Sequence, residues 1–452
     1  IKGAEIISSF SRNVLHKEIM APVLGYVGNI SKQEIFNNPE LTKYSGLKVG
    51  KTGIEKDLDS ALRGDIGFRI QERDSYGKLV RNISIEPPKK GKNLRLSIDL
   101  ELQKKLFYEF KGRKGALVAI EPKTGLIRAL ISSPTYDPNL LNTINDYDEV
   151  RNLFSDQDSP LFNRALSGQY PPASTLKPFV GMAALEAKTI SWEKEILDSG
   201  EYLVEGDERP YRGWKEGGHG KVDMNKAIIE SSDVYFYSLA YDLTVSNLSP
   251  FLEKFGFGEQ SGLTIREGTG ILPSRKWKLG YKGESWFKGD TINMGIGQGY
   301  ITATPLQIAV AYSALANKGE LVQPRIIEKI GEENTETVIK KNISLIDDLN
   351  WKRIEKSLLG VVEASNGTAN NIYDRNIRIA GKTGTAQVKS IIETEYELLR
   401  EYKSLRDHAL FVGYGPVEEP KLVVVAIIEN GESGSAVAAP LVRKAINLYS
   451  KK

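Results

Sequence analysis

Three short polar motifs, separated by long stretches of chain, constrain the fold more than any other feature. They read Ser-Thr-Leu-Lys at 174–177, Ser-Ser-Asp at 231–233 and Lys-Thr-Gly-Thr at 382–385. Together they supply hydroxyls, amines and a carboxylate, which are groups that can activate a serine nucleophile. We interpret them as one constellation, so the chain must fold with three distant segments at one place.

None of the motifs is specific by itself, and context separates them from chance copies. Lys51 lies in GLKVGKTG, which resembles a phosphate-binding loop, but that spacing requires Gly where Ser45 stands, and no apolar strand precedes it. Lys123 lies between two apolar strands, so we interpret it as part of their turn. The spacing Ser-x-x-Lys recurs at positions that we interpret as a helix N-cap, a hairpin turn or turn-like segments, namely Ser191, Ser75, Ser285 and Ser45.

The first motif is predicted to lie at the start of a helix. In QYPPASTLKPFVGMAALEA a Pro-rich stop directly precedes a long apolar helical run. The hydroxyl of Ser174 therefore lies at a helix N-terminus, where free backbone N–H groups and the helix dipole favour developing negative charge. Ser174 and Lys177 are three residues apart on one helical face, so the amine can reach the hydroxyl.

The third motif is predicted to lie on a strand. The segment IRIAGKTGTAQV alternates between apolar and polar residues, with Gly384 where a ligand must approach closely. A strand carrying Thr383 and Thr385 can pair edge-on with a peptide, and its hydroxyls can hold a terminal carboxylate.

Composition narrows the class of protein further. With 452 residues and 40% hydrophobic content, the chain can bury a sizeable core in two to three domains. Zero cysteines argue against thiol chemistry and a cysteine-based zinc site, and a net charge of only +3 demands no nucleic-acid partner. No apolar run approaches the roughly 18–20 residues that span a bilayer. Because the chain starts at Ile1 rather than Met, we expect a membrane anchor upstream.

Two units are expected along the chain. Residues 1–92 are charged, carry short strand signals and end at the linker EPPKKGKN. Residues 93–452 place apolar helical stretches between early and late strands, which indicates an α+β fold whose sheet is completed by the C-terminal segment. The run LVVVAII near Val425 is predicted to be a buried strand of that sheet.

We expect the base to be a group other than histidine, since His16, His219 and His408 all lie outside the motifs. Lys177 can accept a proton near pH 7 only if burial and a second cation, Lys382, lower its pKa.

The remaining groups receive roles from their chemistry. Ser231 would relay a proton to the leaving amine, and Asp233 would orient it and anchor a substrate amide. The backbone N–H groups of Ser174 and Thr385 could form an oxyanion hole.

The chain resembles the class B penicillin-binding proteins over nearly its whole length, and most of all the penicillin-binding protein 2 subfamily of the cell-elongation machinery. Beside the motifs, the resemblance rests on segments such as FNRALSGQYPPASTLKP, GHGKVDMNKAIIESSDVYFY and GDTINMGIGQGYITATPLQ. Asp233, where most relatives carry Asn, is typical of that subfamily. The resemblance implies a strand-rich N-terminal pedestal and a transpeptidase domain with an antiparallel sheet sandwiched by helices.

The resemblance also implies a function, the cross-linking of D-Ala-D-Ala stem peptides of peptidoglycan at the periplasmic face of the inner membrane, inhibited by β-lactams. It implies no cofactor, and as partners an acceptor amine, a membrane glycosyltransferase and a scaffold protein. The catalytic residues would be Ser174, Lys177, Ser231, Asp233 and Lys382, with Thr383, Gly384 and Thr385 binding substrate.

Two departures from the family pattern bear on the site. Ala173 stands where the family usually has Gly, which removes a permissive residue from the turn into the helix. Some members carry a metal near GHG, with a Cys inside the middle motif and an Asp in the loop before it, but here the matching positions are Ser232 and Gly213. Asp198 and His219 remain as possible ligands, too few for a closed site, so we expect no metal.

Three other functions share parts of this pattern. A class A β-lactamase needs a deacylating Glu in an E-x-x-L-N-like segment between the second and third motifs, and none is present. A β-lactam sensor needs only the acylation step. A D,D-carboxypeptidase differs in using water as the acceptor, which the residues leave open.

One further segment is a candidate lid. The stretch SIIETEYELLREYKSLR follows the third motif, and its apolar helical face could cover the acceptor side of the cleft. That face comprises Ile392, Tyr396, Leu399 and Tyr402.

Overall fold

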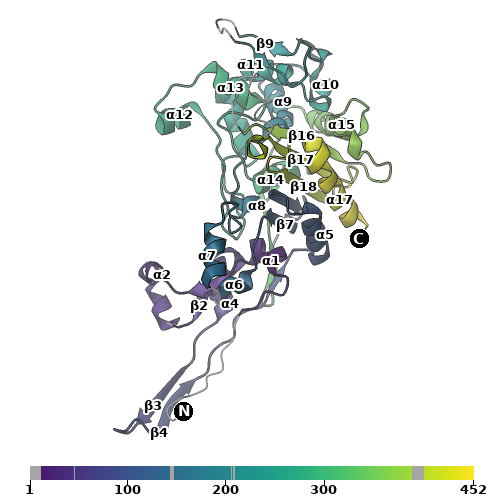
Figure 1. Cartoon of the computed structure of the whole chain (residues 1–452). Helices are drawn as coiled ribbons and strands as arrows, with labels where there is room; N and C mark the ends of the chain where they lie inside the picture. Colours follow the sequence, from purple (N-terminus) through teal and green to yellow (C-terminus); the bar gives the residue numbers. More distant parts are fainter. Residues whose placement is uncertain are drawn as a thin grey trace.

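The structure is a computed structural model that describes residues 12–44, 46–142, 147–204, 206, 209–388 and 402–451. The molecule is elongated, with a slender N-terminal part that ends in a long two-stranded ribbon and a larger body that holds the main sheet and most of the helices (Figure 1). Helices and strands are mixed along the chain, which confirms the predicted α+β class.

A five-stranded antiparallel sheet forms the centre of the body, in the order β16-β17-β18-β6-β7. Its strands span Ala380–Ala386, His408–Gly415, Leu422–Ile428, Gly115–Ile120 and Ile127–Ser133. β18 carries LVVVAII and is buried along its whole length, as predicted, because β-branched apolar residues suit a strand covered on both faces. β16, which carries the third motif, is an edge strand, so one side of its backbone is not paired with another strand of this sheet.

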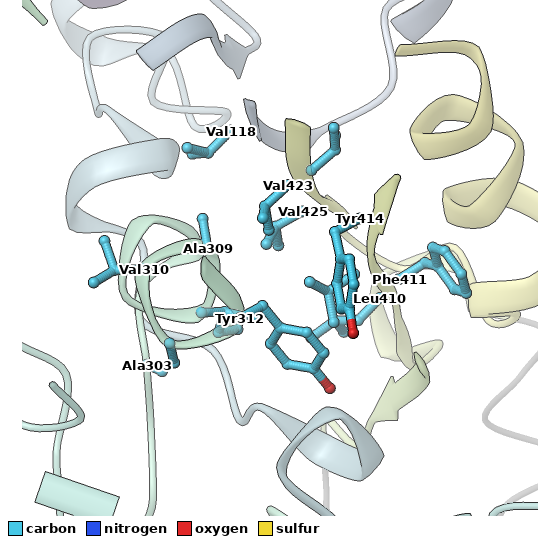
Figure 2. Packing of buried hydrophobic residues seen from close by; sticks show 14 of the residues in the cluster. Val118, Ala303, Ala309, Val310, Tyr312, Leu410, Phe411, Tyr414, Val423 and Val425 are labelled. Carbon is cyan, nitrogen blue, oxygen red and sulfur yellow. The ribbon is translucent and has the colours of Figure 1, made fainter. Parts of the chain in front are cut away.

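Helices cover both faces of this sheet, as expected for the sandwich. α5 (Leu100–Phe110) and α17 (Ala439–Ser450) pack together on one face, and α14 (Pro305–Ala316) and α8 (Arg164–Ser167) pack on the other. Figure 2 shows side chains of α14, including Ala309 and Tyr312, facing Val423 and Val425 of the sheet. Removing a valine side chain such as Val423 or Val425 from water stabilises the fold by about 1.5–3 kcal/mol.

A helical lobe lies beside the sheet and carries the other motifs. Its central helix, α9 (Lys177–Glu186), is buried on almost every side, as its apolar sequence predicts. α9 packs on α11 (Asp233–Lys254), which in turn packs on α13 (Lys288–Gly295). The lobe also contains α10 (Met224–Ile229), α12 (Arg275–Lys282) and α15 (Leu349–Glu363).

The N-terminal part is built from short elements and an exposed ribbon. Its helices are α1 (Lys17–Leu24), α2 (Lys32–Asn37), α3 (Gly53–Asp57) and α4 (Asp59–Arg63), and its strands are β1 (Val27–Asn29), β2 (Lys48–Gly50), β3 (Phe68–Arg73) and β4 (Leu79–Glu86). β3 pairs with β4 to form the ribbon, whose residues are exposed apart from the half-buried Gln71. After the linker, β5 (Leu94–Leu96) pairs with β13 (Ile327–Ile330), which joins the chain to the body.

The remaining elements are short connections. They are α6 (Pro138–Asn142), α7 (Tyr147–Ser155), β8 (Ile196–Asp198), β9 (Glu201–Tyr202), β10 (Tyr211–Arg212), β11 (Gly220–Val222), β12 (Glu320–Val322), β14 (Glu333–Asn334) and β15 (Ile339–Asn342). Among the helices that the structure describes, none is both long enough and apolar enough to cross a membrane.

Two local sequence interpretations were wrong. Ser191 does not cap a helix, because the segment after it forms a turn and then β8, which pairs with the distant β11. A short strand, β2, does precede Lys51, because that segment pairs with β1. In both cases pairing with a distant strand outweighs the local pattern. Lys123 does lie in the turn between β6 and β7, and Ser75 in the turn of the ribbon, as predicted.

Phe179 fixes the position of α9, and its truncation should be costly. Its ring is fully buried and meets Phe255, Phe257 and Tyr312 edge-on, with centroids 4.9, 5.5 and 5.4 Å away. We expect Phe179→Ala to lower the free energy of unfolding by about 3–5 kcal/mol, because it leaves a cavity at the junction of three elements. Urea unfolding measures this, with Phe162→Ala, at a side chain that is 45% exposed, as the control. Equal losses for both variants would contradict this role.

Candidate active site

Ser174 lies in a 3-10 turn, Ala173–Leu176, that leads into α9 at Lys177. The residue before it, Ala173, has a left-handed backbone with φ of 50°. Its N–H donates to Gly297 O at 2.8 Å. Gly297 must lack a side chain, because a Cβ there would lie 2.1 Å from the Ala173 carbonyl oxygen. The turn therefore forms with alanine in place of the family's glycine, at a strain of about 1–2 kcal/mol.

The first and second motifs meet through the Lys177 amine, which is completely buried. Its Nζ donates to Asp233 Oδ1 at 2.6 Å, to Ser231 O at 2.8 Å and to Ser231 Oγ at 3.2 Å. Within the described residues, Ser174 Oγ is not among the hydrogen-bond partners of this amine. Catalytic contacts of this kind often tighten only when substrate is bound, so the geometry leaves Lys177 as a candidate base.

Ser231 lies between the two lysines, as the sequence predicts. Its Oγ also hydrogen-bonds to Lys382 Nζ, at 2.8 Å. Ser231 has a left-handed φ of 60° in the tight turn between α10 and α11, which directs its side chain and its carbonyl group toward the same amine, Lys177. One hydroxyl therefore connects two amines from different motifs.

Asp233 begins α11, and both of its oxygens are engaged. Oδ1 accepts from Lys177, and Oδ2 accepts from the backbone N–H of Trp214 at 2.9 Å. The contacts make this carboxylate the counter-ion of Lys177 and a fixed point for the Trp214 loop. They offer no direct support for the expected second role, the anchoring of a substrate amide.

The third motif lines the other wall of the site. Lys382 is fully buried, and Thr383 Oγ1 lies 2.7 Å from Thr368 Oγ1. Gly384 allows β16 to approach the first motif, since a Cβ there would lie 3.1 Å from Thr175 Cγ2. Thr385 is exposed at the edge of the sheet. The eight predicted site residues thus come from three distant segments that the fold brings together.

Sequence reasoning missed three residues that support this site. Trp214 covers the second motif, and its Nε1 also donates to Ser231 O at 3.1 Å. Gln298 Nε2 donates to Thr385 O at 2.9 Å, and Thr368 pairs with Thr383. Each contact joins residues far apart in the chain, so no local spacing could have indicated it.

The two buried amines differ in their electrostatic surroundings. Burial lowers the pKa of Lys177, while the Asp233 carboxylate opposes that shift. Burial and then the positive charge of Lys177 lower the pKa of Lys382 well below its usual range. From the sequence we expected the charge of Lys382 to lower the pKa of Lys177. The structure indicates that the repulsion between the two amines acts mainly on the pKa of Lys382, because Asp233 contacts Lys177 and not Lys382.

The candidate metal ligands form a hydrogen-bonded cluster instead of a metal site. Asp198 Oδ2 accepts from Ser232 Oγ and lies the same 2.6 Å from His219 Nδ1. His219 Nε2 is buried and has no partner within the described residues, yet Gly213 offers no donor and a neutral serine is a poor zinc ligand. In the part of the chain that the structure describes, no group of three or more potential ligands is assembled. These residues do not fit zinc.

The candidate lid lies almost entirely outside the described residues. Of its predicted apolar face, only Tyr402 is described, and it is 65% exposed.

Known protein families and known proteins match this chain over nearly its whole length. Residues 115–447 match the penicillin binding protein transpeptidase domain, and residues 1–96 match the penicillin-binding protein dimerisation domain. The peptidoglycan D,D-transpeptidase MrdA of Haemophilus influenzae is 39% identical over 98% of this chain and 70% of its own length.

Solved structures of similar proteins agree with the sequence matches. Pseudomonas aeruginosa PBP2 in complex with WCK 5153 superposes with a TM-score of 0.86 at 38% identity, over 98% of this chain and 91% of that one. Helicobacter pylori PBP2 in its complex with MreC gives 0.86 at 31%, over 98% and 79%. A chain of a peptidoglycan synthase complex that coordinates polymerization and crosslinking gives 0.81 at 30%, over 96% and 74%.

The lowered pKa of Lys382 should make its effect on stability depend on pH. An unfolded lysine keeps its proton up to about pH 10.4, whereas the folded protein loses this proton at lower pH. The wild type therefore gains stability, relative to Lys382→Met, as pH rises toward 10. We therefore compare the free energy of unfolding of Lys382→Met with that of the wild type. The value for the variant minus the value for the wild type should fall as the pH rises from 7 to 10. For Lys421→Met, at an exposed lysine, it should stay flat. Parallel behaviour of the two variants would contradict the shift.

The purified protein should contain no stoichiometric zinc, because only Asp198 and His219 are ordinary zinc ligands here. Elemental analysis after purification without chelator measures this, and addition of zinc should not raise the unfolding temperature. One tightly held zinc per chain would overturn the expectation.

Proposed function

The chain belongs to the penicillin-binding protein transpeptidase family, and on that premise we propose that the residues gathered around Ser231 Oγ carry out its acyl transfer. Its activity is that of a serine-type peptidoglycan D,D-transpeptidase, which cross-links stem peptides through an acyl-enzyme. The observation that carries the proposal is the hydroxyl of Ser231 between two buried amines, 3.2 Å from Lys177 Nζ and 2.8 Å from Lys382 Nζ.

Acylation begins at Ser174. Its Oγ attacks the carbonyl carbon between the two D-Ala residues of the donor peptide while its proton passes to the neutral form of Lys177. The developing oxyanion is held by the backbone N–H groups of Ser174 and Thr385, and each such donor contributes roughly 10²–10³ in rate. The peptide bond then breaks, and Ser231 delivers a proton from the lysine pair to the departing D-Ala amine.

Deacylation is the same exchange in reverse with a different amine. The acceptor amine of a second stem peptide attacks the ester carbonyl and loses its proton to Lys177. Lys177 passes this proton to Ser174 Oγ as the ester C–O bond breaks, which restores the free hydroxyl and the neutral amine. Asp233 keeps Lys177 in place through both steps. A positioned general base contributes about 10²–10⁴ in rate.

Substrate binding falls to the edge of the sheet. β16 is the edge strand of the described sheet, so an extended peptide can add beside it as a further strand, with Gly384 allowing close approach. The hydroxyls of Thr383 and Thr385 suit the terminal carboxylate of the donor, and the buried Lys382 adds positive charge behind them when it is protonated.

The N-terminal part has a different role in this proposal. Residues 1–92 form a pedestal and residues 93–452 the transpeptidase domain, which acts at the periplasmic face of the inner membrane. The dimerisation-domain match over residues 1–96 supports this division. The complexes of similar proteins with MreC and within a synthase support a scaffold protein and a membrane glycosyltransferase as partners.

A β-lactam should form a stable ester at Ser174, because nucleophile, base and oxyanion donors are assembled there. Intact-mass spectrometry should show one adduct per chain, absent in Ser174→Ala and unchanged in Ser191→Ala, where the serine lies in an exposed turn with the same spacing to a lysine. Labelling that persists in Ser174→Ala would refute the assignment.

Cross-linking should depend on partners more than acylation does. Acylation needs only the transpeptidase domain, whereas delivery of the acceptor strand needs the pedestal and the polymerising partner. We expect this chain alone to react with β-lactam at the same rate as the chain reconstituted with glycosyltransferase and scaffold in proteoliposomes, but to form far less dimeric muropeptide. Equal dimer yields in the two preparations would remove the partner-dependent role.

A further inference from the structure

An arm of the helical lobe, residues 274–288, extends from the body beside α13 and contains the helix α12 (Figure 1). The helix begins at the N-cap Ser274, whose Oγ accepts from Trp277 N at 3.1 Å, and it ends at Gly283 with a left-handed φ of 70°. These two caps define a stable short helix. The arm contains none of the catalytic residues.

Three aromatic rings contact one another in succession and are here called the aromatic platform: Trp277 and Tyr281 on this arm, and Tyr300 beyond it. Trp277 and Tyr281 stack at 5.3 Å with 18° between their planes, and Trp277 lies 5.5 Å from Tyr300. Tyr281 is 71% exposed. Because Trp277 covers one face of the Tyr281 ring, much of that exposed area belongs to its outer face and edge.

A buried lysine contacts one ring of the platform, Tyr300. Lys278 is only 1% exposed, and its Nζ bonds to Asp290 Oδ2 of α13 at 2.7 Å. The same ammonium lies 5.3 Å from the Tyr300 ring centroid and 4.5 Å from that of Phe287. Desolvated cation–π contacts of this kind fix ring positions. The ammonium therefore fixes Tyr300, and Tyr300 in turn packs against Trp277, the ring on which the exposed Tyr281 stacks.

The platform is linked directly to the active site by a short segment, Gly297–Tyr300. Gly297 accepts the hydrogen bond from Ala173, the residue before the nucleophile. Gln298 donates to Thr385 at the end of the third motif. Tyr300, the last residue of the segment, is part of the platform. The platform thus lies on a continuation of the segment that contacts both the residue before the nucleophile and the end of the substrate strand.

We propose that the aromatic platform binds the glycan strand that carries the stem peptide. This inference rests on the proposed function, because a peptidoglycan stem reaches Ser174 attached to a sugar polymer. The C–H faces of pyranose rings are apolar and slightly positive, so they pack on the electron-rich faces of aromatic rings. Four basic residues and one acidic residue lie between Ser274 and Lys288. One of the four, Lys278, is buried against Asp290, and the remaining positive excess matches a polymer whose stems end in carboxylates.

A membrane surface would be the other chemical match for a basic helix with exposed aromatic residues. Two observations favour the glycan. The arm lies on the catalytic body, far from the ribbon of β3 and β4 along the long axis of the molecule (Figure 1). The platform is also continuous with the substrate site, whereas a membrane contact would need no such link.

The test measures binding of the whole chain to insoluble peptidoglycan glycan from which stem peptides have been removed by an amidase. Tyr281→Ala should weaken retention on this glycan roughly twofold to tenfold, as expected for the loss of one aromatic contact. Tyr281→Phe, which keeps the ring, should bind as the wild type does. Leu279→Ala is the matched control, because Leu279 is an exposed aliphatic residue of the same helix.

Two parallel measurements separate the possible outcomes. All variants should acylate with β-lactam at the wild-type rate, and none should bind vesicles of anionic phospholipid appreciably. Equal retention of Tyr281→Ala and Leu279→Ala, absence of wild-type retention, or vesicle binding that depends on Tyr281 would each overturn the inference. Loss of the β-lactam adduct in the wild type would instead remove the proposed function.

Discussion

Two lysine amines buried around one serine hydroxyl form the interaction on which the rest of the active site depends. Lys177 and Lys382 are both fully buried, and Ser231 Oγ bonds to both. Taking a cation out of water costs several kcal/mol even after the protein relaxes. The site forms because the packing of three separate elements supplies enough free energy to offset this loss of hydration.

The scaffold meets this requirement with rigid elements and two strained turns. α9 is locked by aromatic packing at Phe179, and β16 is held against the first motif by the absence of a side chain at Gly384. Ala173 and Ser231 both adopt left-handed backbones directly at the reacting groups. Strain of this kind persists only where the surrounding packing determines the conformation, and here both strained residues lie in turns that belong to the site.

The asymmetric placement of one carboxylate gives the two amines different tasks. Asp233 contacts Lys177, so that amine stays fixed while burial lowers its pKa. Lys382 has no such contact in the described structure and experiences the charge of Lys177, which favours its neutral form. Trp214 donates hydrogen bonds to both Asp233 and Ser231. The loop that carries Trp214 therefore contacts both residues that hold the Lys177 amine.

The motifs and their local settings could be predicted from the sequence. The apolar run after Ser174 and the alternation around Lys382 indicated a helix start and a strand, and LVVVAII indicated a buried strand, because these patterns reflect which faces a segment must bury. The resemblance to a family with an antiparallel sheet between helices then predicted how these pieces assemble. The spacing within a motif involves only a few consecutive residues, so it can be recognised without knowledge of the fold.

Tertiary structure decided what each of these groups touches. The sequence contained both lysines and Asp233, but only the folded chain determines which amine the carboxylate contacts, and so which amine carries the repulsion. Trp214, Gln298 and Thr368 act through partners 15 to 87 residues away, and the segment after Ser191 became a strand because its partner lies in β11. Hydrogen bonds, burial and strand pairing depend on which residues are neighbours in space. The spacing of residues within a short segment does not determine those neighbours.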